Sequence, residues 1–132
     1  GCTSLIKAPE IPDSVTDMDL TFSQCTSLTQ APEIPSSVTS MRLTFYRCTG
    51  LTQAPEIPSS VTNMNNTFSE CISLTGNLIV NATLKEDDYY WMGCLSDAAT
   101  NEGCNLVLSG SCPKLQQIYE TANENPNVTI KQ

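Results

Sequence analysis

The sequence predicts an α/β repeat fold, a solenoid in which copies of one short unit stack as successive coils. Residues 25–47 and 48–70 differ at only six positions, so the repetition is not an accident of composition. A period of about 20–50 residues is typical of solenoids, and the period here is 23 residues. The cysteines that follow this period are Cys2, Cys25, Cys48, Cys71 and Cys94.

Apolar residues fall into columns when the repeats are aligned. One repeat supplies only a thin layer of these residues, whereas stacked repeats would join each column into a continuous core. Parallel strands would place neighbouring repeats about 4.8 Å apart, so the side chains of one column would be in contact. The columns are Leu5, Leu28, Leu51 and Leu74; Ile11, Ile34, Ile57 and Val80; Val15, Val38, Val61 and Leu84; and Phe22, Phe45, Phe68 and Trp91.

The strand half of the early repeats contains prolines. In the second repeat Pro32 lies between Ala31 and Ile34, and proline cannot donate a hydrogen bond to a strand ladder. We therefore expect the first three strands to be short or irregular. The fourth repeat has no proline at residues 77–80, Asn-Leu-Ile-Val, and its branched residues favour a more regular strand.

The other half of each repeat has helical spacing. In the third repeat, Pro58 and two serines precede Val61, Met64 and Phe68, which combines a serine cap with apolar residues on one face. The segment is long enough for only about two helical turns. We therefore expect either a short α- or 3₁₀-helix or a chain of turns.

The repeat motif resembles that of a known family. The pattern C-x-x-L-x-x-A-P-E-I-P-x-S-V-T-x-M-x-x-T-F-x-x-C, over residues 2–75, is similar to the repeat of the BspA-like leucine-rich-repeat proteins of bacterial cell surfaces. The resemblance implies a right-handed leucine-rich-repeat solenoid with short parallel strands and short convex helices or turns. It also implies a secreted or surface-anchored location and, as in some members, adhesion to host or bacterial proteins.

Residues 76–132 predict a C-terminal cap that continues the tandem repeats of residues 1–75 as one domain. A capping box, Thr-Leu-Lys-Glu, begins a predicted helix over residues 83–95. A serine ahead of an early proline begins a second predicted helix over residues 111–122. Each helix follows or precedes a short apolar strand, so the cap is an enlarged form of the same unit. The predicted strands are residues 105–108 and 127–130.

The first coil is predicted to be open. The chain begins inside a repeat, so we expect it to be part of a larger exported protein. An uncovered first coil would expose apolar residues and favour end-to-end self-association. These residues are Leu5, Ile11, Val15 and Phe22.

The chain has seven cysteines and no histidine. Stacked coils lie within the Cα separation of disulfides, so bonds along the column are one alternative. Equivalent side chains point parallel, however, which favours buried thiols at Cys25, Cys48 and Cys71. No C-x-x-C motif or Cys/His cluster occurs, and no metal site is predicted. The cap cysteines, among which a disulfide stays open, are Cys94, Cys104 and Cys112.

The composition is acidic. Six basic residues against fourteen acidic ones give a net charge of −8, which disfavours nucleic acid and anionic membranes as partners, because both attract basic patches. No apolar run approaches the length for direct membrane insertion.

Two sets of residues are candidate binding sites. Glu10, Glu33 and Glu56 share one column beside the strand positions and would form an acidic stripe for a basic partner or a weakly bound cation. The alternative is that these carboxylates are duplicated, solvated groups that bind nothing, although stacked like charges cost stability. The second candidate set is Arg42, Tyr46 and Arg47.

The sequence gives little support for catalysis. There is no histidine, no G-x-S-x-G motif and no glycine-rich phosphate loop, so we predict no enzymatic activity and no cofactor. The leading hypothesis is a bacterial surface or secreted interaction module, adhesin-like, that binds a protein, or alternatively a glycan, through its outer strand face. The competing hypothesis is a passive stalk or spacer segment of a larger surface protein.

Overall fold

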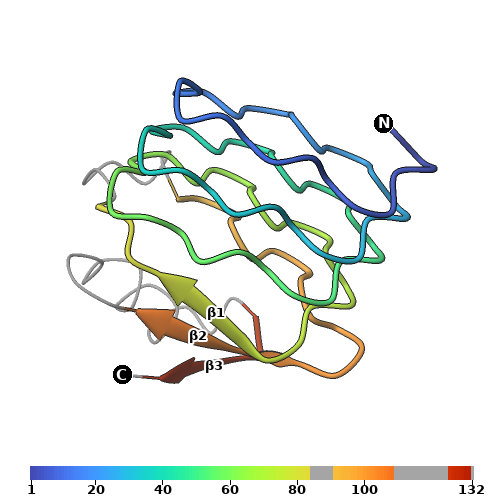
Figure 1. The fold of residues 1–132 in the computed structure, drawn as a ribbon. Helices are drawn as coiled ribbons and strands as arrows, with labels where there is room; N and C mark the ends of the chain where they lie inside the picture. Colours follow the sequence, from blue (N-terminus) through green and yellow to red (C-terminus); the bar gives the residue numbers. More distant parts are fainter. Residues whose placement is uncertain (84–90, 109–124, 132) are drawn as a thin grey trace.

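The chain winds through stacked layers that end in a small sheet. A computed structural model describes residues 1–83, 91–108 and 125–131. The layers run from the N-terminus at one end to the sheet at the other, near the C-terminus (Figure 1). Three parallel strands form this sheet in the order β1-β2-β3. Their bounds are β1, Asn77–Val80; β2, Cys104–Leu108; and β3, Val128–Lys131.

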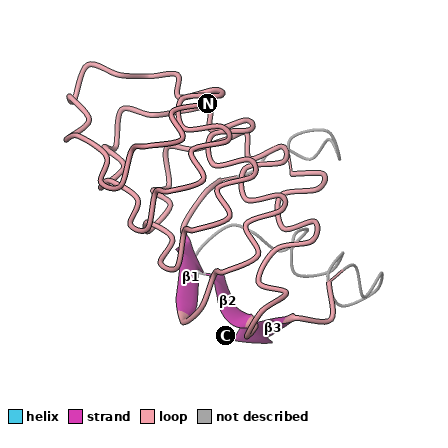
Figure 2. Ribbon diagram, turned by 90° about the vertical axis from the view of Figure 1, so that its right-hand side faces the viewer, coloured by secondary structure: helices cyan, strands magenta, loops and turns pink. Residues whose placement is uncertain are grey.

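The predicted fold class is wrong. The described residues contain no helix and only three short parallel strands in one small sheet (Figure 2), so a leucine-rich-repeat solenoid with a helical cap is not what they form. Residues 58–64, expected to be a helix or turns, form a turn and an isolated bridge. The helix predicted over residues 83–95 is replaced by turns over residues 91–95. The remainder of that helix and the helix predicted over residues 111–122 lie outside the described residues.

Tandem tight turns replace the predicted helices. The Thr44 N–H donates to the Met41 carbonyl at 3.2 Å, and the Cys48 N–H donates to the Phe45 carbonyl at 3.0 Å. Leu43, inside the first of these turns, has a φ of 56°, a left-handed conformation that an α-helix excludes. Each turn of four residues thus reproduces the apolar spacing of a helix without its hydrogen bonds to the fourth residue back.

Hydrogen bonds join each layer to the next through alternate residues of these turns. The first and second layers are joined by the N–H groups of Met18, Leu20, Phe22 and Gln24, which donate to the carbonyls of Ser40, Arg42, Thr44 and Tyr46. The second and third layers repeat the arrangement, from Met41, Leu43, Phe45 and Arg47 to Asn63, Asn65, Thr67 and Ser69. The 23-residue period of the sequence is therefore the backbone register of the first three layers.

The strand predictions are confirmed. The segments predicted at residues 77–80, 105–108 and 127–130 correspond to β1, β2 and β3, each within one residue. The proline-containing segments of the first three layers form only isolated bridges, such as Lys7 with Gln30 and Gln30 with Gln53. Regular pairing thus begins where the prolines end, as expected from the missing N–H groups.

The apolar columns meet in one core. The rings of Phe22, Phe45 and Phe68 stack with centroids 5.6 and 5.5 Å apart, and Leu28, Leu51 and Leu74 are each at most 1% exposed. Trp91 is buried in the same core, as predicted. The predicted place of Trp91 in the phenylalanine column is wrong, however, because the Phe68 N–H donates to the carbonyl of Cys94. This bond aligns Leu95 with Phe68.

The period changes in the fourth layer. The Leu43 N–H donates to Asn65, 22 residues further along the chain, whereas the equivalent Asn66 N–H donates to Met92, 26 residues further along. The fourth layer is therefore four residues longer than the others. Cys94 is 23 residues after Cys71 in sequence, but the same register aligns it with Thr67. Its predicted place in the cysteine column is therefore wrong.

Candidate binding groove

The Glu10, Glu33 and Glu56 column lies along a series of hollows on the bridge side of the layers. The largest hollow, about 490 Å³, is bordered by the Ala-Pro-Glu-Ile segment of the second layer and by Pro55, Glu56 and Pro58 of the third. A hollow of about 270 Å³ lies between the first and second layers, and a smaller one of about 130 Å³ adjoins Glu10 and Glu33. Because they share Glu33, these hollows form one surface, which we name the proline–glutamate groove.

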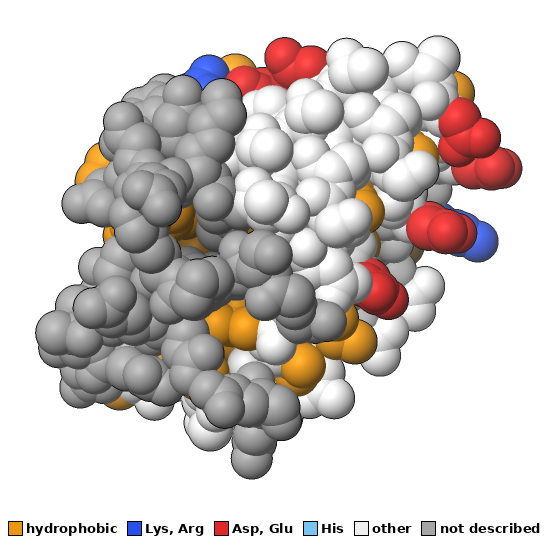
Figure 3. Space-filling view, turned by 90° about the vertical axis from the view of Figure 1, so that its left-hand side faces the viewer, with side chains coloured by type: hydrophobic (Ala, Val, Ile, Leu, Met, Phe, Trp, Pro, Cys, Tyr) orange, Lys and Arg blue, Asp and Glu red, His pale blue; other side chains and the backbone are white. Residues whose placement is uncertain are grey.

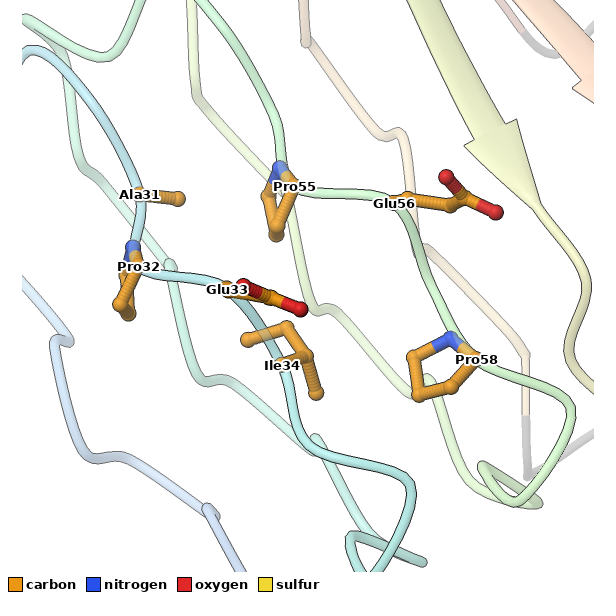
Figure 4. Close-up of a pocket in the computed structure, with 7 residues that line it drawn as sticks. All are labelled: Ala31, Pro32, Glu33, Ile34, Pro55, Glu56 and Pro58. Atoms are coloured by element: carbon orange, nitrogen blue, oxygen red, sulfur yellow. The ribbon is translucent and has the colours of Figure 1, made fainter. Parts of the chain in front are cut away.

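The carboxylates of the groove differ in their hydrogen bonding. Glu33 and Glu56 both extend from their own layer toward the next one (Figure 4). The Asn81 amide donates to Glu56 Oε1 at 2.6 Å. Positions 35 and 58, which correspond to Asn81 in the preceding repeats, are prolines and have no donor to offer. Glu10 and Glu33 consequently make no hydrogen bond or ion pair with any described residue.

Proline rings form the walls beside these carboxylates. Pro32 and Pro55 are buried, while Glu10, Glu33 and Glu56 are exposed. An exposed carboxylate above an apolar wall suits a lysine or arginine, whose aliphatic stem packs on apolar surface while its charged head stays in water. The groove can therefore bind a basic side chain in each of the two places where the carboxylate has no partner.

Arg42, the first residue of the second candidate set, links two layers. Its Nε is 3.3 Å from Asp19 Oδ2, and its N–H donates to Asp19 Oδ1 at 2.9 Å. Ser40 donates to the same oxygen at 2.5 Å. The guanidinium is thereby engaged with the preceding layer, and Arg42 does not line the groove.

Tyr46 and Arg47 are engaged in the opposite direction. The Arg47 Nε donates to Glu70 Oε2 at 2.9 Å, and the Tyr46 hydroxyl donates to Glu70 Oε1 at 3.2 Å. The Arg47 guanidinium also lies 5.2 Å from the centroid of the Tyr46 ring. The hydrogen bond from Arg47 lowers the pKa of Glu70 below its ordinary value. These two residues therefore join the second layer to the third, outside the groove.

The sequence contained an unused signal for both ion pairs. Asp19 and Arg42 are one 23-residue period apart, and so are Arg47 and Glu70. Opposite charges at the same position of adjacent repeats are expected to face each other once the repeats stack. Asn81, the partner of Glu56, could not be found in this way, because its position is proline in the preceding repeats.

The cysteine column contains thiols, as predicted. Cys25, Cys48 and Cys71 are buried and not in disulfides. Cys104 is also a buried thiol, whose pKa is raised by burial. Cys112 lies outside the described residues.

The described surface offers no other site of comparable definition. Acidic side chains gather toward one edge of the face in Figure 3, and uncharged polar groups and backbone cover most of the described remainder. No three His, Cys, Asp or Glu side chains in the described parts of the chain are placed to hold a metal ion. Across those parts we also find no helix with the length and apolar character of a membrane span.

Comparison with known proteins finds no matching family model, no matching characterised protein and no matching solved structure.

Proposed function

We propose that this chain is a bacterial surface or secreted interaction module, adhesin-like, that binds a protein segment through the proline–glutamate groove. The observation that carries the proposal is the repetition of one arrangement, an exposed carboxylate without a partner beside buried proline rings, at Glu10 and Glu33. A carboxylate needed only for solubility has no reason to recur over a hollow. The stacking of like charges there also carries a cost in stability.

The chemistry of the groove favours a basic partner. Each open carboxylate offers an acceptor for one lysine or arginine, and adjacent proline rings offer apolar surface for its stem. The net charge of −8 steers cationic segments toward the molecule and repels nucleic acid. A neutral glycan, the alternative ligand, would use the hydrogen-bonding capacity of the groove but not its charge.

The motif resemblance to BspA-like bacterial surface proteins supports the extracellular or cell-surface location and the adhesive role. It supports no conclusion about the identity of the partner. The module functions in this proposal without a cofactor and without catalysis.

A charge-matched pair of variants tests the groove. Glu10→Gln/Glu33→Gln removes both open carboxylates and keeps the shape of the side chains. We expect it to weaken binding of a peptide of alternating lysine and serine by about two- to five-fold for each lost ion pair, measured by isothermal titration calorimetry. Added salt should weaken the wild-type interaction in the same direction, because exposed charges are screened beyond about 8 Å at physiological ionic strength.

The control is Asp97→Asn/Glu102→Gln, which removes two exposed carboxylates that do not line the groove. It should leave binding unchanged, and a lysine-acetylated form of the peptide should bind neither protein. Equal loss of binding in the two double variants would show that only net charge attracts the peptide, and undiminished binding after the groove substitutions would refute the proposal.

A passive spacer is the second candidate function, and one observation favours it. The ion pairs of Arg42 with Asp19 and of Arg47 with Glu70 each join adjacent layers, so several of the charged groups outside the groove are used within the molecule. A spacer predicts that no ligand class binds the groove, which the same titration distinguishes.

A further inference from the structure

Every layer-to-layer interface has a direction. Along the turns, the earlier layer always donates its N–H groups and the later layer always accepts through its carbonyls, as in Phe22 to Thr44 and Phe45 to Thr67. Each layer therefore has an acceptor side that faces the N-terminal end of the stack. The acceptor side of the second and third layers is covered by the preceding layer.

The acceptor side of the first layer is open. By the repeat register, its acceptors are the carbonyls of Asp17, Asp19, Thr21 and Ser23. The Ser23 carbonyl accepts a hydrogen bond from the N-terminal ammonium group of Gly1. The other three carbonyls accept no hydrogen bond from any described residue, although their counterparts in later layers all do.

Apolar groups accompany these open carbonyls. Leu5, Ile11 and Val15 are only partly buried, whereas their equivalents Leu28, Ile34 and Val38 are at most 6% exposed. Leu20 is 50% exposed and Ile6 is 66% exposed. The later equivalents of Ile6 are threonines, and Thr52 and Thr75 donate from Oγ1 to a carbonyl of the preceding layer. The first layer thus has an apolar side chain where later layers reach back with a hydroxyl.

This open side is not complementary to itself. Two copies in face-to-face contact would set carbonyl against carbonyl along the turns, and acceptors cannot pair with acceptors. Glu10, Asp13, Asp17 and Asp19 of the first layer would add repulsion between like charges. A partner that fits must present donors and an apolar edge in the direction of a preceding layer.

The other end of the same chain has an edge of that kind. Strand β3 is the last strand of the parallel sheet, and its residues Val128 and Ile130 pack partly against the core. The sequence of β3 has one lysine and no acidic residue. An unpaired strand edge is a template for pairing with another chain. In a head-to-tail contact, β3 would lie beside residues 5–8 and continue the stacking of layers.

We propose that two copies of this chain associate head to tail, with the open side of the first layer of one copy against the β3 end of the other. The contact continues the register that already joins one layer to the next, and it is independent of the proline–glutamate groove. Because it is heterologous, each added copy leaves a free head and a free tail, so the assembly grows with concentration rather than stopping at a dimer.

Sedimentation velocity over a dilution series tests this assembly. The wild-type chain should show a weight-average mass that rises with concentration, and more strongly at higher salt, because screening reduces repulsion between copies of charge −8. The head variant Ile6→Lys/Leu20→Lys should stay at the monomer mass. Its matched control, Thr29→Lys/Leu43→Lys, places the same charges at the equivalent positions of the covered second layer and should associate like the wild type.

Mixing two blocked variants distinguishes the direction of the contact. The tail variant Ile130→Lys places a charge at the β3 edge and should also be monomeric alone, with thermal unfolding used to confirm that each variant is folded. A mixture of head and tail variants keeps one compatible pair of ends, so it should form dimers and nothing larger. Self-association of the tail variant would indicate head-to-head contact, and a wild-type chain that remains monomeric at every concentration would overturn the proposal.

Discussion

The cysteine thiols of the third and fourth layers act as buried hydrogen-bond donors. The Cys48 thiol donates to the Phe22 carbonyl at 3.0 Å, and the Cys71 thiol donates to the Phe45 carbonyl at 2.9 Å. Burial raises the pKa of Cys48 to about 12 and raises the pKa of Cys71 as well. Each thiol thereby satisfies a buried carbonyl, and its protonated form belongs to the folded state.

Alkaline pH should therefore destabilise the protein through these thiols. Below the ordinary cysteine pKa of 9.0 both states keep the Cys48 proton, and stability does not change on its account. Between that value and about 12 the unfolded chain loses the proton while the folded chain keeps it, so the free energy of unfolding falls by about 1.4 kcal/mol per pH unit for each such thiol. Urea denaturation at a series of alkaline pH values measures the slope.

The Cys48→Ala variant is the control for that slope. It removes one thiol and leaves the other titrating groups in place, so its stability should decline less steeply than that of the wild type. Parallel curves for the two proteins would contradict the role given to Cys48.

Leu20 occupies a strained backbone position. It has a φ of 61°, and the equivalent Leu43 and Asn66 have φ values of 56° and 52°. Asparagine adopts this left-handed region more readily than leucine does, and Leu20 is half exposed, so little packing depends on it. Leu20→Asn should raise the free energy of unfolding by about 0.5–1 kcal/mol, measured by urea denaturation. Leu20→Ala keeps the strain and should give no gain, whereas an equal gain for alanine would show that backbone strain is not the cause.

At the scale of the element, apolar spacing did not distinguish a helix from a chain of tight turns. Val61, Met64 and Phe68 are three and four residues apart, which fits one face of a helix, but it also fits turns of four residues that each place one side chain in the core. The difference lies in the backbone, whose N–H groups bond to the next layer. Only the alternative of turns, which the short length of the segment had left open, accounts for residues 58–64.

The strands were predictable because a local signal determines them. Proline withdraws a donor wherever it occurs, so the repeats containing Pro32 and Pro55 could form only isolated bridges. Residues 77–80 lack that obstacle and form β1.

The phenylalanine stack should make the middle ring more important than the first one. Phe45 contacts a ring on each side, whereas Phe22 is stacked on Phe45 alone. Phe45→Ala should lower the free energy of unfolding by about 3–5 kcal/mol, and Phe22→Ala should cost less by about 0.5–1.5 kcal/mol, the contribution of one aromatic pair. Urea denaturation of both variants measures the difference.

An aliphatic pair in the same layers separates stacking from position. Val15→Ala and Val38→Ala remove equivalent groups from the first and second layers without touching a ring. If the difference between the two valine variants equals that between the two phenylalanine variants, the extra cost belongs to the layer rather than to the stack.

At the scale of the whole molecule, the period predicted the candidate site in part. The repeat alignment placed Glu10, Glu33 and Glu56 in one column, and the structure places all three along one groove. Alignment could not show that Arg42 and Arg47 are engaged by carboxylates of adjacent layers, because it was read down columns of like residues rather than between adjacent layers. The proline walls also depended on burial, which a sequence pattern does not give.

The numerical period misled where the layers change length. Cys94 is a whole number of periods from Cys71, yet the fourth layer is four residues longer and aligns Leu95 with Phe68. The extra residues lie between Val80 and Met92, after the last clear repeat. A coincidence of cysteine spacing therefore extended the period beyond the structure that produces it.

The directional hydrogen bonds between layers also determine how the chain can fold. Along the turns, the bonds that hold one layer to the next join residues 22 to 26 positions apart, so each new layer closes a loop of nearly constant length on the layer already formed. The entropic cost of loop closure grows with loop length, and here it does not increase as the stack grows. Folding can thus proceed by addition of one layer after another, with a rate set by the first pair of layers rather than by the length of the chain.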